Sequence, residues 1–436
     1  MTGTRKGKVL AVLVLTLVLC AALFLLYPSS SPHPDSAYPD PCVESIPAPV
    51  ASVEPLAQAN TAFALSFYHE LRPQQKNLVF SPWSVAEALT LASAGAAGET
   101  RAQMVAALHA QHLPSDGLYR QYGELKQTLT GGTKDTGVRL LIANGLWVQQ
   151  GLTMVPNFLD LARSSFGAKV EAVDFKRQAN HARQVINGWI GQQTEGKIRD
   201  LVPPGGLDPS SRVVLTNAIY FKGRWAEPFN KGRTSPNPFT TDEGRTIEVP
   251  MMFQNLTAQY GEREDLQVVE LPYIGCRVSM VVLLPRNPAG LPELEKGFTT
   301  EELQKLLSLL RKEKGQIGLP RFTLRTQAEV VPRLQSLGMR DAFDIQKADF
   351  SALVEKNHRV FINSVLHSAY VAVDEEGTEA AAATVIKVKK SKKESKKDRP
   401  FFFLVDRPFW FGIRHAGTGT FLFMGRVAEP SLPLSK

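Results

Sequence analysis

The sequence predicts one large domain of the α+β class. Apolar residues with the spacing of amphipathic helices come early in the chain, and runs of β-branched and aromatic residues dominate its last part. This order favours separate helical and sheet regions over a repeating β–α–β pattern. With 43% hydrophobic and 21% charged residues, the chain of 436 residues has a globular composition. Its three cysteines allow at most one internal bridge, which excludes a disulfide-stapled scaffold.

Residues 1–27 have the pattern of an export or anchoring signal. Residues 1–8 are basic, and residues 9–26 form an uncharged apolar run that, extended to Tyr27, has about the length of a membrane-spanning helix. Because no small-residue cleavage site directly follows the run, we predict a signal anchor at residues 9–27, with a long cleaved signal peptide as the alternative. Either signal exports the rest of the chain, so we expect an extracellular protein, secreted or tethered to the membrane.

A proline-rich segment separates this signal from the folded domain. Residues 28–55 contain eight prolines together with several serines and aspartates, a composition that cannot bury a core. We therefore expect a linker at residues 28–52 and the folded domain at residues 53–436.

The net charge of +8 is concentrated in two short segments. Three of the basic residues lie in residues 1–8, and residues 386–400 hold eight basic residues against two acidic ones. The rest of the chain is close to neutral, which argues against a nucleic-acid-binding surface spread over the fold.

Helix and strand signals follow one another along the domain. Residues 57–71 and 184–193 have helical spacing, and Ser81 before a proline is expected to cap a further helix. Residues 409–427 are aromatic and β-branched around a Gly-Thr-Gly break, which predicts a buried hairpin. Further strand-like stretches are residues 213–221, 278–284, 360–362 and 369–373.

No motif indicates an enzyme or a metal site. The sequence lacks the His-Glu-x-x-His pattern, the nucleophile elbow and the dinucleotide-binding glycine motif. Residues 191–197 resemble a phosphate-binding loop, but Ile198 stands where Ser or Thr would hold magnesium. We interpret His367, which lies near Ser364 and Ser368, as a buried histidine satisfied by hydrogen bonds, because no acid or oxyanion motif accompanies it. We expect a protein that is not an enzyme and needs no metal or cofactor.

Residues 375–389 carry the pattern of a strand where a loop is expected. From Thr378 onward, alternate positions have no charge, whereas the intervening positions carry three charges. The pattern begins at the flexible Gly377 and runs into the lysine-rich stretch, which must be solvated. The four alanines at 380–383 are small enough to slide between neighbours, which suits a strand that inserts late. The alternative is a short helix, since alanine is the best helix former.

Several motifs together resemble the serpins, the serine protease inhibitor superfamily. Residues 375–384 are similar to the hinge of an inhibitory serpin's reactive-centre loop, and residues 403–413 and 418–427 are similar to the family's C-terminal signature. The resemblance extends over about residues 57–430. Other family-like stretches are residues 77–84, 216–225, 270–273 and 365–369.

The resemblance implies a fold with three β-sheets, eight to nine helices and an exposed reactive-centre loop at about residues 375–402. It also implies suicide inhibition, in which a protease cuts a bait bond and the cleaved loop inserts as a new central strand, distorting the trapped acyl-enzyme. The implied hinge residues are Glu375, Glu376, Gly377, Thr378, Glu379, Ala380, Ala381, Ala382, Ala383 and Thr384. The residues implied at the shutter and breach, where the sheet opens, are Ser81, Ser84, Asn217, Trp225 and His367.

The resemblance places the bait bond ambiguously, because the loop carries an insertion. Counting forward from Glu375 and counting back from Pro408 give different positions, and the forward count should govern because it sets the length of strand that can insert. It predicts the bond Lys390–Ser391, which implies a trypsin-like serine protease as the target. The alternative bonds are Ser391–Lys392, Lys392–Lys393 and Lys397–Asp398.

Three functions fit these features. Inhibition of a trypsin-like protease is favoured by the small, uncharged hinge, and a non-inhibitory chaperone or carrier is favoured by the overlong basic loop. A binding module would use the lysine-rich loop to dock on a polyanion. We expect a monomer with a protease as covalent partner, a polyanion as a second partner at this loop, and a membrane tether through residues 9–27.

Overall fold

The computed structural model describes residues 53–130, 138–355, 358–378 and 400–431, all of which belong to the compact unit Glu44–Lys436. The expected basic segment 1–8, the signal anchor 9–27 and the linker 28–52 therefore lie outside the described residues. Within the described ranges, no helix combines the length and hydrophobicity needed to cross a membrane.

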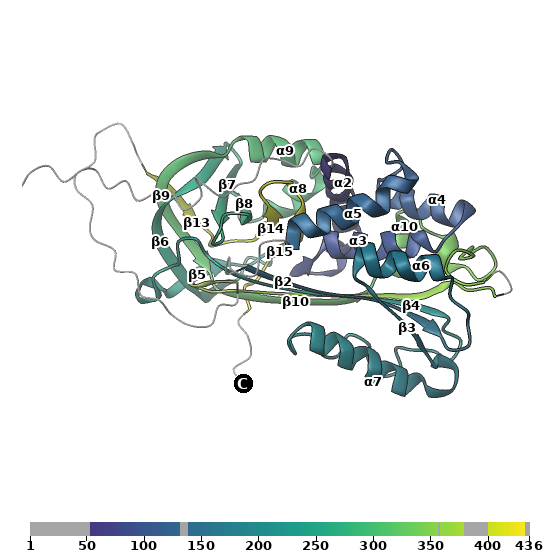
Figure 1. The fold of residues 1–436 in the computed structure, drawn as a ribbon. Helices are drawn as coiled ribbons and strands as arrows, with labels where there is room; N and C mark the ends of the chain where they lie inside the picture. Colours follow the sequence, from purple (N-terminus) through teal and green to yellow (C-terminus); the bar gives the residue numbers. More distant parts are fainter. Residues whose placement is uncertain (1–52, 131–137, 356–357, 379–399, 432–436) are drawn as a thin grey trace, which may run out of the picture. The chain divides into compact units, whose positions relative to one another are not determined.

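A six-stranded sheet runs through this unit (Figure 1). Its two central strands, β4 and β11, are parallel neighbours joined by eight residue pairs. The very short β12 lies between them at one end and pairs with both. In sheet order, the strands are β10 (Phe322–Glu329), β11 (Ile362–Val373), β12 (Gly377–Thr378), β4 (Val213–Arg224), β2 (Val138–Gln149) and β3 (Lys169–Val173).

The other described strands form a nine-stranded sheet with two parts. The long strand β6 belongs to both parts, because it pairs with β7 near its C-terminal end and with β9 and β5 before that. The six-stranded sheet and these two parts correspond to the three sheets expected. In sheet order, the strands are β1 (Leu78–Phe80), β15 (Phe421–Val427), β14 (Phe409–His415), β8 (Val278–Pro285), β7 (Leu266–Pro272), β6 (Thr246–Arg263), β9 (Arg311–Pro320) and β13 (Phe401–Leu404), with β5 (Ser235–Thr240) on β6.

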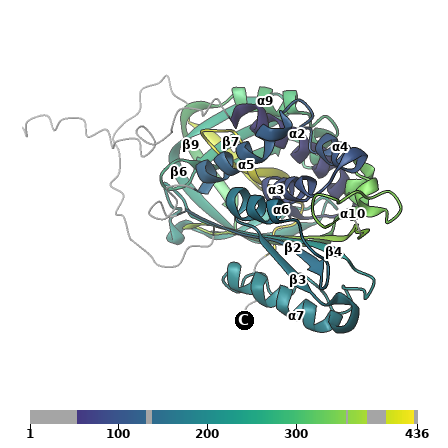
Figure 2. The same cartoon turned by 45° about the vertical axis from the view of Figure 1, so that its right-hand side comes forward.

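Helices cover both faces of the six-stranded sheet. Helix α7 lies on one face, and α3, α5 and α6 lie on the other (Figures 1 and 2). The described ranges contain nine α-helices: α2 (Glu54–Leu71), α3 (Pro82–Ala94), α4 (Gly98–Ala107), α5 (Ser115–Thr130), α6 (Pro156–Leu161), α7 (Phe175–Gln193), α8 (Leu291–Lys296), α9 (Thr300–Ser308) and α10 (Val331–Ser336). Short 3-10 or π turns are η2 (Arg72–Gln74), η3 (Ala162–Phe166), η4 (Lys231–Arg233) and η5 (Asp341–Phe343).

Two hydrophobic cores explain this layering. Val213, Leu215 and Ile219 of β4 face the larger core, whereas Val214 and Ala218 face a smaller core beneath α7. Because successive residues of a strand point to opposite faces, β4 is buried on both sides. A nearly continuous apolar run of this kind is typical of a central strand covered by helices on both faces.

Most local predictions are confirmed, and one is wrong. The Ser81 side chain caps α3 by accepting the backbone N–H of Ser84 at 3.1 Å, and β14 and β15 form the buried hairpin. Residues 360–362 and 369–373 are not separate strands, because β11 is continuous from Ile362 to Val373. Polar residues in the middle of β11, including His367, interrupt the apolar pattern without interrupting the ladder.

Candidate functional site

A buried polar cluster crosses the middle of the six-stranded sheet. His367 of β11 lies directly opposite Asn217 of β4, with 2.5 Å between His367 Nδ1 and Asn217 Oδ1. The backbone N–H of Ser81 donates to His367 Nε2 at 3.3 Å, so the ring proton must be on Nδ1, which donates to Asn217. Burial lowers the pKa of His367 to about 3, and the ring is therefore neutral at physiological pH.

The same cluster ties the sheet to helix α3. The side-chain amide of Asn217 donates to the backbone oxygen of Ser84 at 2.9 Å, to the Ser84 hydroxyl and to Asn144 of β2. All of these side chains are buried. We call Ser81, Ser84, Asn144, Asn217 and His367 the central polar cluster.

Acidification is expected to weaken the folded state through His367. Below its usual pKa of 6.5 the histidine takes up a proton in the unfolded chain, but the buried ring does not until about pH 3. The unfolded state thus binds more protons in this window, and the stability of the folded state falls as the pH falls. Between pH 6.5 and 4.5 we expect a loss of about 2 kcal/mol, measured by urea unfolding at both pH values. A His367→Asn variant should lose most of this slope; an unchanged slope would contradict the assignment.

The start of the expected loop is already part of the sheet. Gly377 pairs with Arg224 of β4, and Thr378 pairs with Gly223 of β4 and Val373 of β11. Thr378 is fully buried, and its hydroxyl lies 2.7 Å from the hydroxyl of Tyr273. The segment thus begins as a strand wedged between β4 and β11.

Position 377 accepts only glycine. Gly377 has a φ of +149°, and a Cβ atom built there would lie 2.0 Å from the backbone oxygen of Gly223. No side chain fits at that distance, and this backbone conformation is one that other residues rarely adopt. The close approach of Gly377 to β4 therefore depends on the missing side chain.

Trp225, at the end of β4, holds the residues just before this point. Its indole N–H donates to the backbone oxygen of Asp374 at 3.0 Å, and its backbone N–H donates to that of Glu376 at 2.8 Å. Its ring stacks on Tyr273, with 4.6 Å between the ring centroids. Trp225 and Tyr273 together clamp the segment from Asp374 to Thr378.

Glu375 adds an ionic tie to the same segment. It is buried, and its two carboxylate oxygens share the N–H of Arg321 Nε, each at 2.9 Å. Arg321 Nη2 and the Thr234 hydroxyl also donate to Glu375 Oε1. Burial opposes ionisation, but the hydrogen bonds from Arg321 and Thr234 outweigh it and hold the pKa of Glu375 below its usual range. Its neighbour Glu376 pairs with Lys231 at the surface.

The protein family of this chain follows from its similarity to known proteins. A family model described as Serpin (serine protease inhibitor) matches residues 58–430. The chain belongs to the serpin family. Serpin B8 from Homo sapiens is 38% identical over 388 residues, which cover 87% of this chain and 100% of that protein. Leukocyte elastase inhibitor A from Rattus norvegicus is 35% identical over 388 residues, with 87% and 100% covered.

Solved structures confirm the serpin fold that the sequence predicts. The crystal structure of human thyroxine-binding globulin with thyroxine matches with a TM-score of 0.79 and 27% identity, covering 88% of this chain and 100% of that chain. The similar serpins thus include an inhibitor of a protease and a protein that binds thyroxine. Serpins that share this fold thus differ in function.

The structure brings the sequence-predicted residues of this serpin together in two places. Ser81, Ser84, Asn217 and His367 lie in the central polar cluster, and Trp225 lies against Glu375–Thr378 at one end of β4. Asn144 was missed, although an Asn-Gly pair inside an apolar strand pattern could have indicated it. The hinge residues Glu379, Ala380, Ala381, Ala382, Ala383 and Thr384 and the bait-bond candidates Lys390, Ser391, Lys392, Lys393, Lys397 and Asp398 lie outside the described residues.

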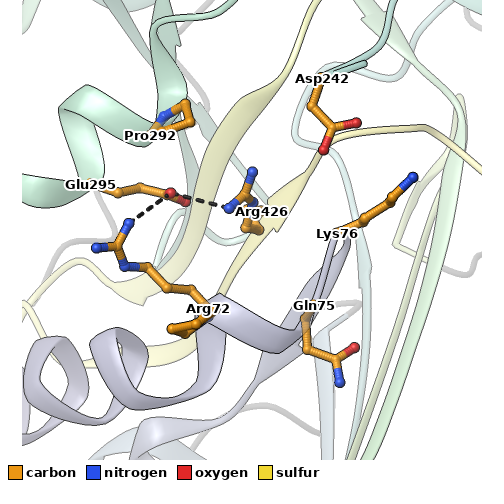
Figure 3. A pocket seen from close by; sticks show the side chains of 8 residues that line it. Arg72, Gln75, Lys76, Asp242, Pro292, Glu295 and Arg426 are labelled. Carbon is orange, nitrogen blue, oxygen red and sulfur yellow. Dashed lines mark hydrogen bonds and ion pairs between the residues drawn. The ribbon is translucent and has the colours of Figure 1, made fainter.

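This serpin also has a charged cavity of about 470 Å³ between η2, α8 and β15 (Figure 3). The carboxylate of Glu295 is fully buried there, 3.3 Å from Arg72 and 3.1 Å from Arg426. The hydroxyl of Tyr68 donates to it at 2.5 Å. Burial, followed by the charge of Glu295, raises the pKa of Tyr68 well above its usual value. In the described ranges, no group of three or more His, Cys, Asp or Glu side chains could hold a metal ion.

Proposed function

We propose that this serpin is a suicide inhibitor of a trypsin-like serine protease outside the cell. The observation that carries the proposal is the position of β12, because the first residues of the loop already occupy the place between β4 and β11 that an inserted strand would extend. In the sequence, β12 is followed by Glu379 and then by the four alanines at 380–383, which are small enough to continue that strand.

The chemistry of trapping begins at the bait bond. The serine oxygen of the protease bonds to the carbonyl carbon of Lys390, and the bond from that carbon to the nitrogen of Ser391 breaks as this nitrogen leaves as a protonated amine. The protease is then held by an ester to the new C-terminus. Insertion of the freed strand carries the ester-linked protease along and distorts its active site before water can cleave the ester.

For the strand to insert, β4 and β11 must part. In this proposal the central polar cluster is the shutter, because its Asn217–His367 hydrogen bond joins these two strands. Trp225 and Glu375 form the breach, where the hinge enters. Completed insertion replaces one parallel ladder with two antiparallel ones, so the uncleaved state is the less stable of the two.

The proposal also assigns functions to the residues that precede the serpin domain. We propose that residues 9–27 export and anchor the protein and that residues 28–52 are the linker to a serpin domain at residues 53–436. The alternative functions are a non-inhibitory chaperone or carrier, and docking of the lysine-rich loop on a polyanion; neither requires a covalent complex with a protease.

The test is to mix the full chain with trypsin and separate the products by denaturing electrophoresis. We expect a band at the summed mass of protease and serpin fragment, and mass spectrometry should place the cut after Lys390. A Lys390→Ala variant should form at least about tenfold less of this complex, because trypsin needs a basic residue before the bond it cuts.

The matched control is Lys397→Ala, which changes the same kind of residue in the same basic run and should leave complex formation intact. If Lys397→Ala abolishes the complex and Lys390→Ala does not, the forward count of the loop is wrong. Cleavage without any complex, also with plasmin-like and kallikrein-like proteases, would refute inhibition and favour the alternatives.

A further inference from the structure

We infer that an ion pair between the buried Glu87 and the partly exposed Lys126 acts as a second restraint on sheet opening, because it holds Asn144 of β2 against helix α3. The inference rests on the proposed function, since opening of the sheet matters for activity only if the loop inserts. It assigns a role in sheet opening to two residues, Glu87 and Lys126, that no motif in the sequence indicates.

Glu87 is a charged residue in a helix that is otherwise apolar or small on all sides. Every residue of α3 from Pro82 to Ser93 is buried, and the Glu87 side chain is 1% exposed. Lys126 of α5 lies 2.8 Å from Glu87 Oε1, and the side-chain amide of Asn144 donates to Glu87 Oε2 at 2.7 Å. Each oxygen of this buried carboxylate therefore has its own partner on a different element.

The pair is anchored on one side and connected to the central polar cluster on the other. Lys126 also donates to the backbone oxygen of Phe166, at the end of η3, which fixes the ammonium group between two helical elements. Asn144, in turn, accepts a hydrogen bond from the side chain of Asn217. A continuous chain of polar contacts thus runs from α5 through Glu87 to β2, β4 and finally His367 on β11.

We expect opening of the sheet to break this series of polar contacts at the hydrogen bond between Asn144 and Glu87. Strands β2 and β4 are joined by eleven residue pairs, so they move as one piece when β4 leaves β11. Helix α3 lies beneath both strands, and Asn144 moves away from Glu87 as β2 slides over it. The carboxylate then loses its donor at Oε2 while it stays buried, a state that is costly for a charged group.

The expected consequence is a slower opening than the central polar cluster alone would produce. Burial raises the pKa of Glu87, whereas Lys126 and Asn144 oppose that shift; the ion pair with Lys126 thus favours the charged carboxylate, which accepts the stronger hydrogen bond from Asn144. Removing either charge should weaken the Glu87–Asn144 hydrogen bond and speed the parting of β4 and β11.

Hydrogen–deuterium exchange, read by mass spectrometry on the full chain, measures this opening without any protease. In Glu87→Gln and Lys126→Met variants we expect the amides of β4 and β11 to exchange roughly tenfold faster or more, while those of β14 and β15 are unchanged. The double variant should be no faster than the faster single one, since the two residues act as one unit. Lys126→Arg should restore slow exchange because it keeps the pair.

Glu295→Gln is the matched control, because it also removes a fully buried carboxylate charge that pairs with basic residues. That change should not selectively speed β4 and β11. Equal exchange in wild type and both single variants would overturn the inference, as would an equal acceleration in β14 and β15. Because exchange involves no protease, a failure of this inference can be told apart from a failure of the wild-type chain to trap trypsin.

Discussion

Replacing Thr378 with arginine is expected to abolish covalent trapping while leaving cleavage of the loop intact. Thr378 is fully buried between β4 and β11, and its hydroxyl lies 2.7 Å from the hydroxyl of the equally buried Tyr273. An arginine there must either bury an unpaired charge or keep the hinge out of the sheet, and burying such a charge costs several kcal/mol. The inserted strand then cannot form before water cleaves the ester to the protease.

The measurement is the number of serpin molecules consumed for each trypsin molecule inhibited, with products resolved by denaturing electrophoresis. For Thr378→Arg we expect cleaved serpin, active trypsin and at least about a hundredfold less complex. Thr378→Ser is the control, because it keeps a small side chain and the hydroxyl. If the arginine variant forms as much complex as wild type, insertion does not start at β12 and the proposed mechanism fails.

Replacing Glu295 with glutamine is expected to lower the free energy of unfolding by about 3 kcal/mol, because a buried ion pair loses one partner. The Glu295 carboxylate lies within 3.3 Å of Arg72 and Arg426 (Figure 3). It also accepts a hydrogen bond from the hydroxyl of Tyr68. Arg426 is itself buried, so in the variant its charge would lose the ion pair with the Glu295 carboxylate. Urea unfolding of the two proteins measures the difference.

The control lies on the same short helix. Glu293 is 79% exposed and pairs with Lys296 at the surface, and Glu293→Gln should change the stability by less than about 0.5 kcal/mol. If both substitutions cost the same, burial is not what makes Glu295 important. If both substitutions lower the free energy of unfolding by more than about 2 kcal/mol, the cause is a disturbance of helix α8 as a whole and not the loss of the Glu295 ion pairs.

Local chemistry explains which elements could be predicted from the sequence. The cap at Ser81 and the hairpin at residues 409–427 each depend on neighbouring residues, so their signals are complete within a short stretch. The continuous strand β11 was not predicted, because its polar residues satisfy one another across strands rather than along the chain. Asn217 and His367 form one hydrogen bond although 150 positions separate them in the sequence.

The site residues that were not predicted from the sequence also depend on contacts between distant segments. Asn144 and Glu87 form a hydrogen bond only because β2 lies over α3. No sequence pattern within either segment indicates this contact. The alternating pattern of residues 375–389 predicts a strand that enters a sheet. It could not predict that Gly377 and Thr378 are already in place, because that depends on the register of β12 against Gly223 and Val373.

The place of the C-terminal hairpin has a consequence for how the molecule is made. Strand β15 follows the other described strands in the sequence, yet it lies between β14 and β1, and Leu78 of β1 pairs with Arg426 of β15. The nine-stranded sheet therefore cannot close until β15 has been synthesised. Such non-local pairing is slow to form. Closure of this sheet thus requires that β1 and β15, which are far apart in the sequence, come together in one step.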